Sequence, residues 1–176
     1  KSAKKISKIH KRKEKSSGGY IIGQCIVFLV LITDKITIPV GFAFFEPDPA
    51  LRVWKKNEEK LKKQGIPKNL RPQKPPKNKK YPTIPKLALV LLKEFKENIH
   101  GIKIKCIFAD ALYGTQIFLD GASKIFEGIQ VISQIRSNQN VIYKNKKISV
   151  EQYFLKHHGI SQTIKIRGGK ECSVIV

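Results

Sequence analysis

Hydrophobic and polar positions change period along this chain, and the changes predict where strands and helices lie. A nearly continuous apolar run over residues 20–32 predicts a strand buried on both faces, in a central position. Residues 36–45 predict the returning strand of a hairpin, with Thr33-Asp34-Lys35 as the turn. Pro39 has no backbone N–H to donate, so we expect this second strand at a sheet edge.

The second half of the chain alternates helical and strand patterns. Helical spacing predicts helices over 83–98 and 115–127, with these apolar inner faces: Leu87, Val90, Leu91, Phe95 and Ile99, then Ile117, Phe118, Ala122, Ile125 and Phe126. Strands are expected over 103–110 and 129–136. A hairpin over 141–148, a short helix near 151–157 and strands over 163–166 and 172–176 follow. Helices that alternate with strands favour parallel pairing, so we expect an α/β fold with a mixed sheet.

The organisation expected is a single, partial domain over residues 1–176. Its parts are a basic lead-in (1–19), the hairpin (20–45), a basic Pro- and Lys-rich excursion (46–82), the helix-strand-helix-strand stretch (83–136) and the start of an insertion or extension (137–176). Within the excursion, residues 51–64 predict a helix that ends at Gly65 and Pro67. The chain begins with Lys1, and we expect it to be part of a longer protein.

The charge of the chain indicates which kind of partner it binds. Lys and Arg number 35 against 13 Asp and Glu, a formal net charge of +22, which predicts a polyanionic partner such as nucleic acid. Residues 1–15 carry a net +7 and residues 52–80 a net +10. Solvated surface segments in a lysine-rich protein are the simpler alternative, but acids are too scarce for compositional drift alone. We expect phosphate contacts from both segments.

Several function classes are excluded. Cys25, Cys106 and Cys172 form no CxxC pair, which argues against a zinc ribbon and a disulfide framework. The longest apolar run, over residues 25–32, is too short to span a bilayer, and no signal-peptide pattern is present. The histidines lack metal-ligand spacing, and no P-loop or nucleophile-elbow motif occurs.

Asp110 is the acid with the strongest claim to chemistry. It ends an apolar strand and precedes Ala111-Leu112-Tyr113-Gly114, and the carboxyl ends of strands in α/β sheets face the crevice where ligands bind. A turn or helix-capping role for Asp110 is an equally good interpretation on spacing alone. One carboxylate cannot hold a pair of catalytic metal ions, which needs two or more.

The sequence resembles bacterial insertion-sequence transposases of the Asp-Asp-Glu type. The similarity extends from about residue 4 to residue 176, and its most specific blocks are FADALYG and QIRSNQNV. The resemblance implies an RNase H-like catalytic domain with sheet order 3-2-1-4-5. It implies an enzyme that cuts transposon-end DNA and joins it to target DNA with two divalent ions, Mg²⁺ or Mn²⁺. Asp110 matches the second catalytic acid of the family, at the end of the fourth core strand.

The resemblance also implies what these residues lack. The first catalytic Asp, with its strand, should precede Lys1, and the catalytic Glu should follow Val176 on a helix. Glu171 and Asp34 fit neither position. We therefore expect the 176 residues alone to be marginally stable and inactive. The implied setting is bacterial cytoplasm near the nucleoid, with double-stranded DNA as partner, no membrane, and an oligomer on DNA as an option.

Phosphate contacts are assigned to a set of basic and polar residues: Lys4, Lys5, Lys8, Lys11, Arg12, Lys13, Arg136 and Asn138. Asn138 could instead serve a turn. Two other functions stay open. One is a non-catalytic nucleic-acid-binding protein, although no helix-turn-helix, zinc-finger or RNA-binding signature supports it. The other is the inactive remnant of a transposase gene, which the flanking DNA would reveal.

Overall fold

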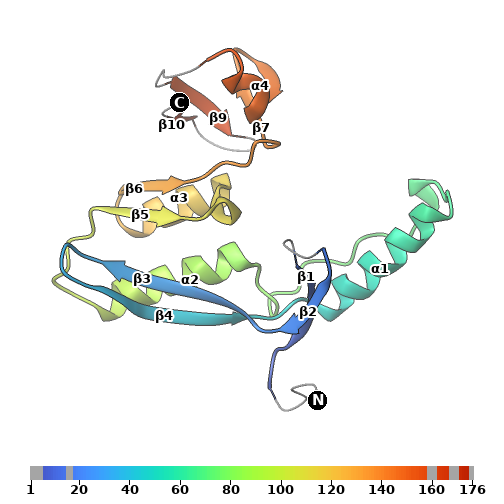
Figure 1. Ribbon diagram of the computed structural model, residues 1–176, viewed down its shortest axis with the longest axis horizontal. Helices are drawn as coiled ribbons and strands as arrows, with labels where there is room; N and C mark the ends of the chain where they lie inside the picture. Colours follow the sequence, from blue (N-terminus) through green and yellow to red (C-terminus); the bar gives the residue numbers. More distant parts are fainter. Residues whose placement is uncertain (1–5, 15–17, 158–161, 167–170, 175–176) are drawn as a thin grey trace. The chain divides into compact units, whose positions relative to one another are not determined.

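The structure is a computed structural model that describes residues 6–14, 18–157, 162–166 and 171–174, with the backbone alone for Lys13 and the last two segments. The chain divides into two compact units, residues 1–91 and 92–176. Both contain small sheets with helices (Figure 1), so the mixed α/β class is confirmed. None of the described helices is long and apolar enough to cross a membrane.

The first unit consists mainly of two antiparallel hairpins and a helical arm. Its elements are β1 (His10–Lys13), β2 (Tyr20–Gly23), β3 (Cys25–Ile32), β4 (Thr37–Phe45), α1 (Pro49–Lys63), the 3-10 turn η1 (Lys68–Leu70) and the first half of α2 (Ile84–Asn98). β1 pairs with β2, and β3 pairs with β4. The single strand expected over 20–32 is therefore two strands, separated at Gln24, whose side-chain amide donates to the carbonyl of Ser7 at 2.8 Å.

The β3–β4 hairpin confirms the expected turn and edge. Thr33 closes the turn, since its hydroxyl accepts from the N–H of Ile36 at 2.9 Å and its own N–H donates to the carbonyl of Ile36. The register slips between Leu29 and Val30, where Val30 lies opposite Pro39. Because a bulge removes a ladder bond, it accommodates the missing N–H of proline. Within the described chain β3 and β4 pair only with one another, so β4 is an edge as expected, but β3 is an edge too and its expected central position is not observed.

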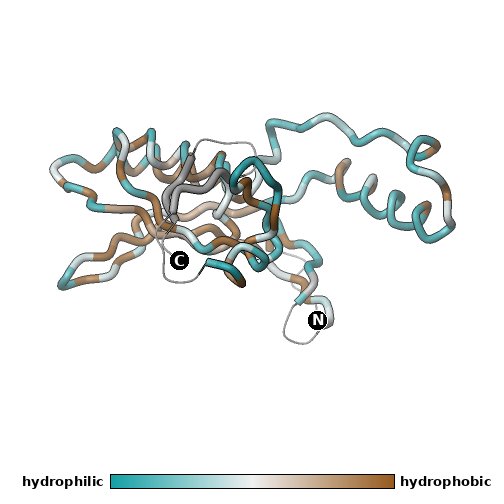
Figure 2. The backbone as a smooth tube through the Cα atoms, turned by 90° about the horizontal axis from the view of Figure 1, so that it is seen from above, coloured by the Kyte–Doolittle hydropathy of each residue, from teal (hydrophilic) through white to brown (hydrophobic). Residues whose placement is uncertain are grey.

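One face of this hairpin is covered and the other is open. Val27 is buried, and on the same side Leu91 of α2 lies against Gly41. Phe28 and Phe42 point the opposite way, and each is 60% exposed. The expectation that the first long strand is buried on both faces is thus wrong for the described residues. Figure 2 shows the hairpin largely in the hydrophobic colour and the α1 segment mostly in the hydrophilic one.

The helix α2 confirms the predicted element but only part of its predicted face. Leu91 and Phe95 are buried as expected, and Ala88 and Leu92 are buried as well. Val90 is 49% exposed, so its assignment to the inner face is wrong. The buried face of α2 is therefore rotated about the helix axis by a few tens of degrees from the face that spacing alone predicts. The rotation is toward Ala88, whose side chain is small.

The second unit begins with the second half of α2 and continues with a parallel strand pair. Its elements are β5 (Cys106–Ala109), the 3-10 turn η2 (Ala111–Tyr113), α3 (Gln116–Ile125), β6 (Gln130–Ser133), β7 (Asn140–Tyr143), β8 (Lys146–Ser149), α4 (Val150–Phe154), β9 (Gln162–Ile166) and β10 (Glu171–Val174). β5 and β6 run parallel, as the helix-strand alternation predicts. Phe118 and Ala122 of α3 are buried, but Ile117 is exposed and Gln116 is buried in its place.

The segment after β6 has a small core of its own. Val141, Val150 and Tyr153 are almost fully buried there. Lys144 and Asn145 both have left-handed φ angles, 46° and 60°, which a two-residue hairpin turn requires. The expected hairpin, short helix and two late strands are confirmed, with β9 and β10 pairing antiparallel.

Candidate active site at the carboxyl ends of β5 and β6

Asp110 stands directly after β5 with its side chain exposed. Its carboxylate accepts a hydrogen bond from the N–H of Ala111 and so caps η2. The capping role considered from sequence is therefore observed. Among the described residues no ion pair involves Asp110. Its carboxylate lies at the open edge of a parallel strand pair, where α/β folds commonly place ligand-binding groups.

The two motif blocks FADALYG and QIRSNQNV meet at this edge. Gly114 has no room for a side chain, because a Cβ built on it would overlap the carbonyl oxygen of Gln134. The side-chain amide of Gln139 donates to the carbonyl of Gly114 at 3.1 Å. Two loops that are some twenty residues apart in sequence thus approach closely and are joined by a side-chain-to-backbone bond.

A serine fixes the strand ends in register. Ser133, the last residue of β6, lies opposite Ala109 in the parallel ladder. Its hydroxyl donates to the carbonyl of Asp110 at 2.9 Å. The bond holds the backbone of the acid beside the end of β6. Sequence reasoning missed Ser133 and Gln139, since a lone serine or glutamine at a strand end carries no pattern that marks such a bond.

Arg136 and Asn138 lie in the loop that follows β6, and both side chains are exposed. The carbonyl of Arg136 accepts from the N–H of Gln139 at 2.9 Å, which makes this loop a tight turn. Arg136 therefore lies at the same strand ends as Asp110. Its loop is joined to the loop after Asp110 by the bond from Gln139 to Gly114. The turn role that was the alternative for Asn138 agrees with its position inside this bend.

The residues described at this edge do not by themselves fit a divalent metal pair. Such a pair needs two or more carboxylates around ions about 4 Å apart. The described chain contains no cluster of three or more His, Cys, Asp or Glu side chains that could hold a metal. Asp110 supplies one carboxylate, one oxygen of which already accepts from Ala111.

The structure describes only part of the basic lead-in that was assigned to phosphates. Lys8, Lys11 and Arg12 are exposed on or beside β1, while Lys4 and Lys5 lie outside the described residues and only the backbone of Lys13 is described. Residues 10–13 of the lead-in thus form a strand, β1. Lys11 lies over the ring of Tyr20 with its ammonium 4.5 Å from the centroid, an attraction that favours this position. Neighbouring strand residues point to opposite faces, so Lys11 and Arg12 cannot share one surface.

The second unit also has an open pocket, at the other end of the parallel pair. Its lining includes Ile104 and Ile129, which precede β5 and β6, together with Phe95, Phe126 and the ion pair of Lys96 with Glu127. The hydrogen bond from Lys96 and then its charge lower the pKa of Glu127. This pocket lies at the amino ends of the strands and does not include Asp110.

Comparisons with known proteins do not assign the chain to a group. No protein family matches it, and neither does any curated protein or solved structure. The candidate site therefore depends on its geometry and on the sequence resemblance described above.

Proposed function

We propose that this chain is part of the catalytic domain of a DNA transposase that cuts transposon ends and joins them to target DNA. Asp110 is proposed as one of its metal-binding catalytic acids. The observation that carries the proposal is the exposed carboxylate of Asp110 at the carboxyl end of a parallel strand, beside a loop that holds Arg136. The resemblance of the two motif blocks supplies the reaction class.

Two strand pairings agree with neighbours in the RNase H-like sheet of this proposal, although among the described residues each pair is a two-stranded sheet of its own. β3 and β4 would be the second and third strands of the RNase H-like sheet, and β5 and β6 its fourth and fifth. Parallel sheets are normally covered on both faces, yet Phe108 of β5 is 69% exposed and Ile132, its partner on β6, is 42% exposed. Open apolar faces of this kind are expected of strands that pack against further parts of a larger domain.

The proposal needs divalent ions, Mg²⁺ or Mn²⁺, and carboxylates beyond those described. When bound, such ions activate the attacking oxygen and stabilise the leaving one. Asp110 is the one ligand assigned in this chain. Arg136, on the adjoining loop, is suited to hold a DNA phosphate, since a guanidinium binds phosphate oxygens in a bidentate way. Ser133 and Gln139 would keep the acid and this loop in position.

A metal titration tests the proposed function. The protein expressed from the complete open reading frame is incubated with a plasmid that carries the element ends. We expect nicking and strand-transfer products with Mg²⁺ or Mn²⁺ and none with EDTA. DNA binding without cleavage at any metal concentration would contradict the proposal.

A non-catalytic nucleic-acid-binding protein is the second candidate. The observation that favours it is the capping bond of Asp110, which gives that residue a structural role without any metal. The same titration separates the two functions, because a binding protein would retain DNA with or without metal and would release no cut product.

A further inference from the structure

The most basic part of the chain is also an ordered one. Residues 48–82, here called the basic arm, comprise α1, η1 and the extended segments around them. Over residues 52–80 the sequence carries twelve Lys or Arg against Glu58 and Glu59, a net +10. Every one of these cations except Arg71 is exposed. This charge density exceeds what solubility needs, and it calls for an anionic partner.

Capping interactions define both ends of the helix α1 in the arm. Asp48 caps the start, where its carboxylate accepts from the N–H of Ala50 at 2.9 Å, and Pro49 occupies the first turn. At the other end Gly65 has a φ of 75°, and the N–H of Ile66 donates to the carbonyl of Leu61 at 3.1 Å. Together with the bond from Gly65 to Lys62, this is a Schellman motif, which ends the helix and reverses the chain.

Two side-chain bonds hold the returning segment against α1, and a third stiffens the segment itself. The indole N–H of Trp54 donates to the carbonyl of Pro72 at 2.9 Å. The guanidinium of Arg71 donates to the carbonyl of Ile66 at 2.7 Å and pairs with Glu58 at 2.8 Å. The side chains of Arg71 and Glu58 are only 15% and 25% exposed. This pair is therefore less screened by solvent than an ordinary surface ion pair.

The helix α1 has no fully buried face that could hold the returning segment in place of these bonds. α1 contains no buried residue, although an amphipathic helix normally owes its stability to a buried face. Leu51 and Leu61 are only half-buried, and the brace formed by Trp54, Arg71 and Glu58 supplies the side-chain bonds that join helix and return in the described structure. Without it, the lysines on the two segments would lose their fixed spacing.

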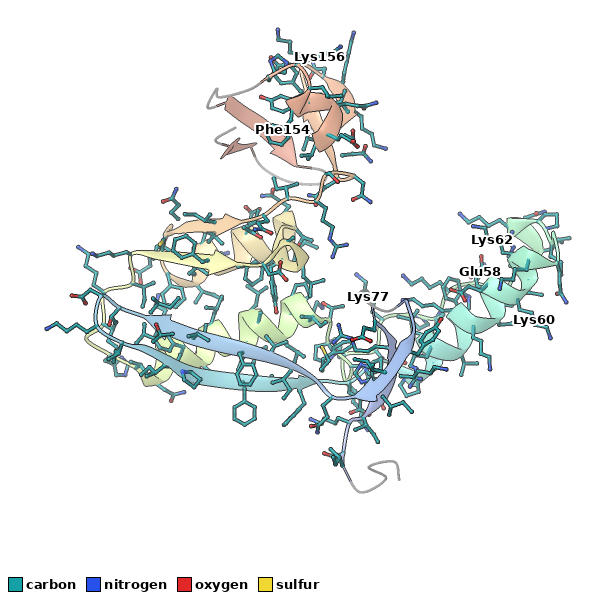
Figure 3. All side chains as sticks on the ribbon, viewed as in Figure 1. Glu58, Lys60, Lys62, Lys77, Phe154 and Lys156 are labelled. Atoms are coloured by element: carbon teal, nitrogen blue, oxygen red, sulfur yellow. The ribbon has the colours of Figure 1, made fainter. Side chains whose placement is uncertain are left out.

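The arm presents charge without a stacking surface. Figure 3 shows Lys60 and Lys62 on opposite sides of α1, as expected for positions about 200° apart on a helix. The aromatic residues of residues 48–82, Trp54 and Tyr81, are both half-buried. Single-stranded nucleic acids are bound largely by stacking of bases on exposed rings, whereas duplex backbones are bound by cations. The arm therefore suits a duplex.

We propose that the basic arm is a preassembled binding surface for the phosphate backbone of duplex DNA, and that Glu58 is a positioning residue which strengthens this binding despite its negative charge. The identity of the polyanion rests on the proposed function. Glu58 acts through Arg71, which it holds against α1. Preassembly spares the protein the entropy of ordering the arm when DNA binds.

Two matched variants test the brace, because charge and bracing predict opposite results for them. Glu58→Ala and Glu59→Ala each raise the net charge by one, and alanine favours the helix. We expect Glu59→Ala to bind a short random-sequence duplex as tightly as wild type or up to about 2-fold more tightly. We expect Glu58→Ala to bind it about 5-fold more weakly, with faster tryptic cleavage within residues 68–80 and a shallower salt dependence.

Two further variants keep the test decisive. Trp54→Phe removes the donor to Pro72 without changing any charge, and we expect it to weaken binding as well. Glu58→Asp keeps the carboxylate and should restore much of the affinity. Equal tightening by Glu58→Ala and Glu59→Ala would overturn the bracing role.

Neutralising the lysines tests the surface itself. The arm set, changed to Gln together, is Lys55, Lys56, Lys60, Lys62 and Lys63. The control set, exposed and equal in charge, is Lys93, Lys105, Lys124, Lys146 and Lys147. Because Lys60 and Lys62 lie on opposite sides of α1, not all five lysines can contact one duplex, and we expect the slope of log Kd against log salt to flatten by about 2–3. The control set should change it by less than about 1.

The results distinguish this inference from the proposed function. If the arm set binds duplex like wild type while metal-dependent cleavage is intact, the inference fails and the transposase proposal stands. If the arm variant binds duplex more weakly and no metal supports cleavage by the wild type, the inference stands and the transposase proposal fails. Tighter binding to single strands or to anionic vesicles than to duplex would also overturn the inference.

Discussion

The basic arm and the edge that carries Asp110 are built in opposite ways. The arm holds exposed cations on a helix without any buried residue, braced by Trp54 and Arg71. At the Asp110 edge there is one acid, and the backbones approach so closely that Gly114 admits no Cβ. Phosphate contacts act over several ångströms and tolerate displacement, whereas catalytic groups must be held within about 0.5 Å. In this account, affinity and chemistry therefore belong to separate parts of the chain.

The largest effect expected is on cleavage by Asp110→Asn. Asparagine keeps an oxygen that can accept from Ala111, so the cap survives while the charge that we propose binds metal is lost. Changes in outer-shell partners of metals already cost about 10–100-fold, so we expect a greater loss, about 1,000-fold, in the cleavage rate. The Kd for duplex should change by less than about 2-fold, since one neutralised acid alters few phosphate contacts.

Two controls sharpen this prediction. Asp34→Asn, in the exposed β3–β4 turn, should leave cleavage unchanged. Asp110→Ala should lose both activity and the cap, and its free energy of unfolding should fall by about 1 kcal/mol. If Asp110→Asn cuts DNA at the wild-type rate, Asp110 is a capping residue only.

Alanine at two glycines compares the rigidity of the two regions. Gly114→Ala would push a methyl group into the carbonyl of Gln134, and we expect a loss of about 2–3 kcal/mol in unfolding free energy. Gly65→Ala in the arm meets open space but keeps a positive φ, so it should cost about 1 kcal/mol. Chemical denaturation measures both. A smaller cost at Gly114 than at Gly65 would show that the edge is the looser region.

The basic residues of the first hairpin should matter less than the arm. Lys8, Lys11 and Arg12 changed together to Gln remove three charges from two faces of β1. Because they cannot all contact one duplex, we expect Kd to rise only about 3-fold and the salt slope to fall by about 1–2. A fall as large as that of the five arm lysines would make β1 an equal part of the interface. An unchanged slope would show that β1 does not contact phosphates.

The smallest effect expected is a dependence of stability on acidic pH. Lys96 lowers the pKa of Glu127 by hydrogen bonding and by its charge, so the folded state favours the carboxylate. The resulting stability is present above the ordinary value of 4.5 and is lost as pH falls through the folded pKa. We expect the Tm of Lys96→Gln to lie slightly below wild type at neutral pH and to converge with it in acid. Lys124→Gln, the control, should show no such convergence. If the difference in Tm between Lys96→Gln and wild type stays constant down to acidic pH, the ion pair of Lys96 with Glu127 does not contribute to stability.

Local patterns were enough to predict most elements of this chain. The helices α1 and α2 were marked by caps and by apolar spacing, and the hairpin of β7 and β8 by Lys144 and Asn145. The strand β1 was missed because its sequence, HKRK, contains no apolar alternation. The burial of the strand run was overestimated, since its apolar residues indicate what a face can bury and not whether a partner covers it.

The candidate site was predictable in position but not in its supports. A carboxylate after an apolar strand marks a strand end, and this is why Asp110 could be found. Ser133 and Gln139 could not be found, because their bonds join residues more than twenty positions apart. The brace of the arm was hidden as well, because its bonds to α1 join residues 13 and 18 positions apart across a chain reversal. Glu58 stands beside Glu59 in a basic helix, and only the return of Arg71 sets the two apart.

The single-turnover rate of cleavage at saturating DNA tests the division between affinity and chemistry most directly. It is measured for the complete protein, for its five-lysine arm variant and for Asp110→Asn. We predict that the arm variant needs more protein to saturate but then cuts at the wild-type rate, whereas Asp110→Asn saturates normally and does not cut. A slow arm variant at saturation, or cleavage by Asp110→Asn, would contradict the account.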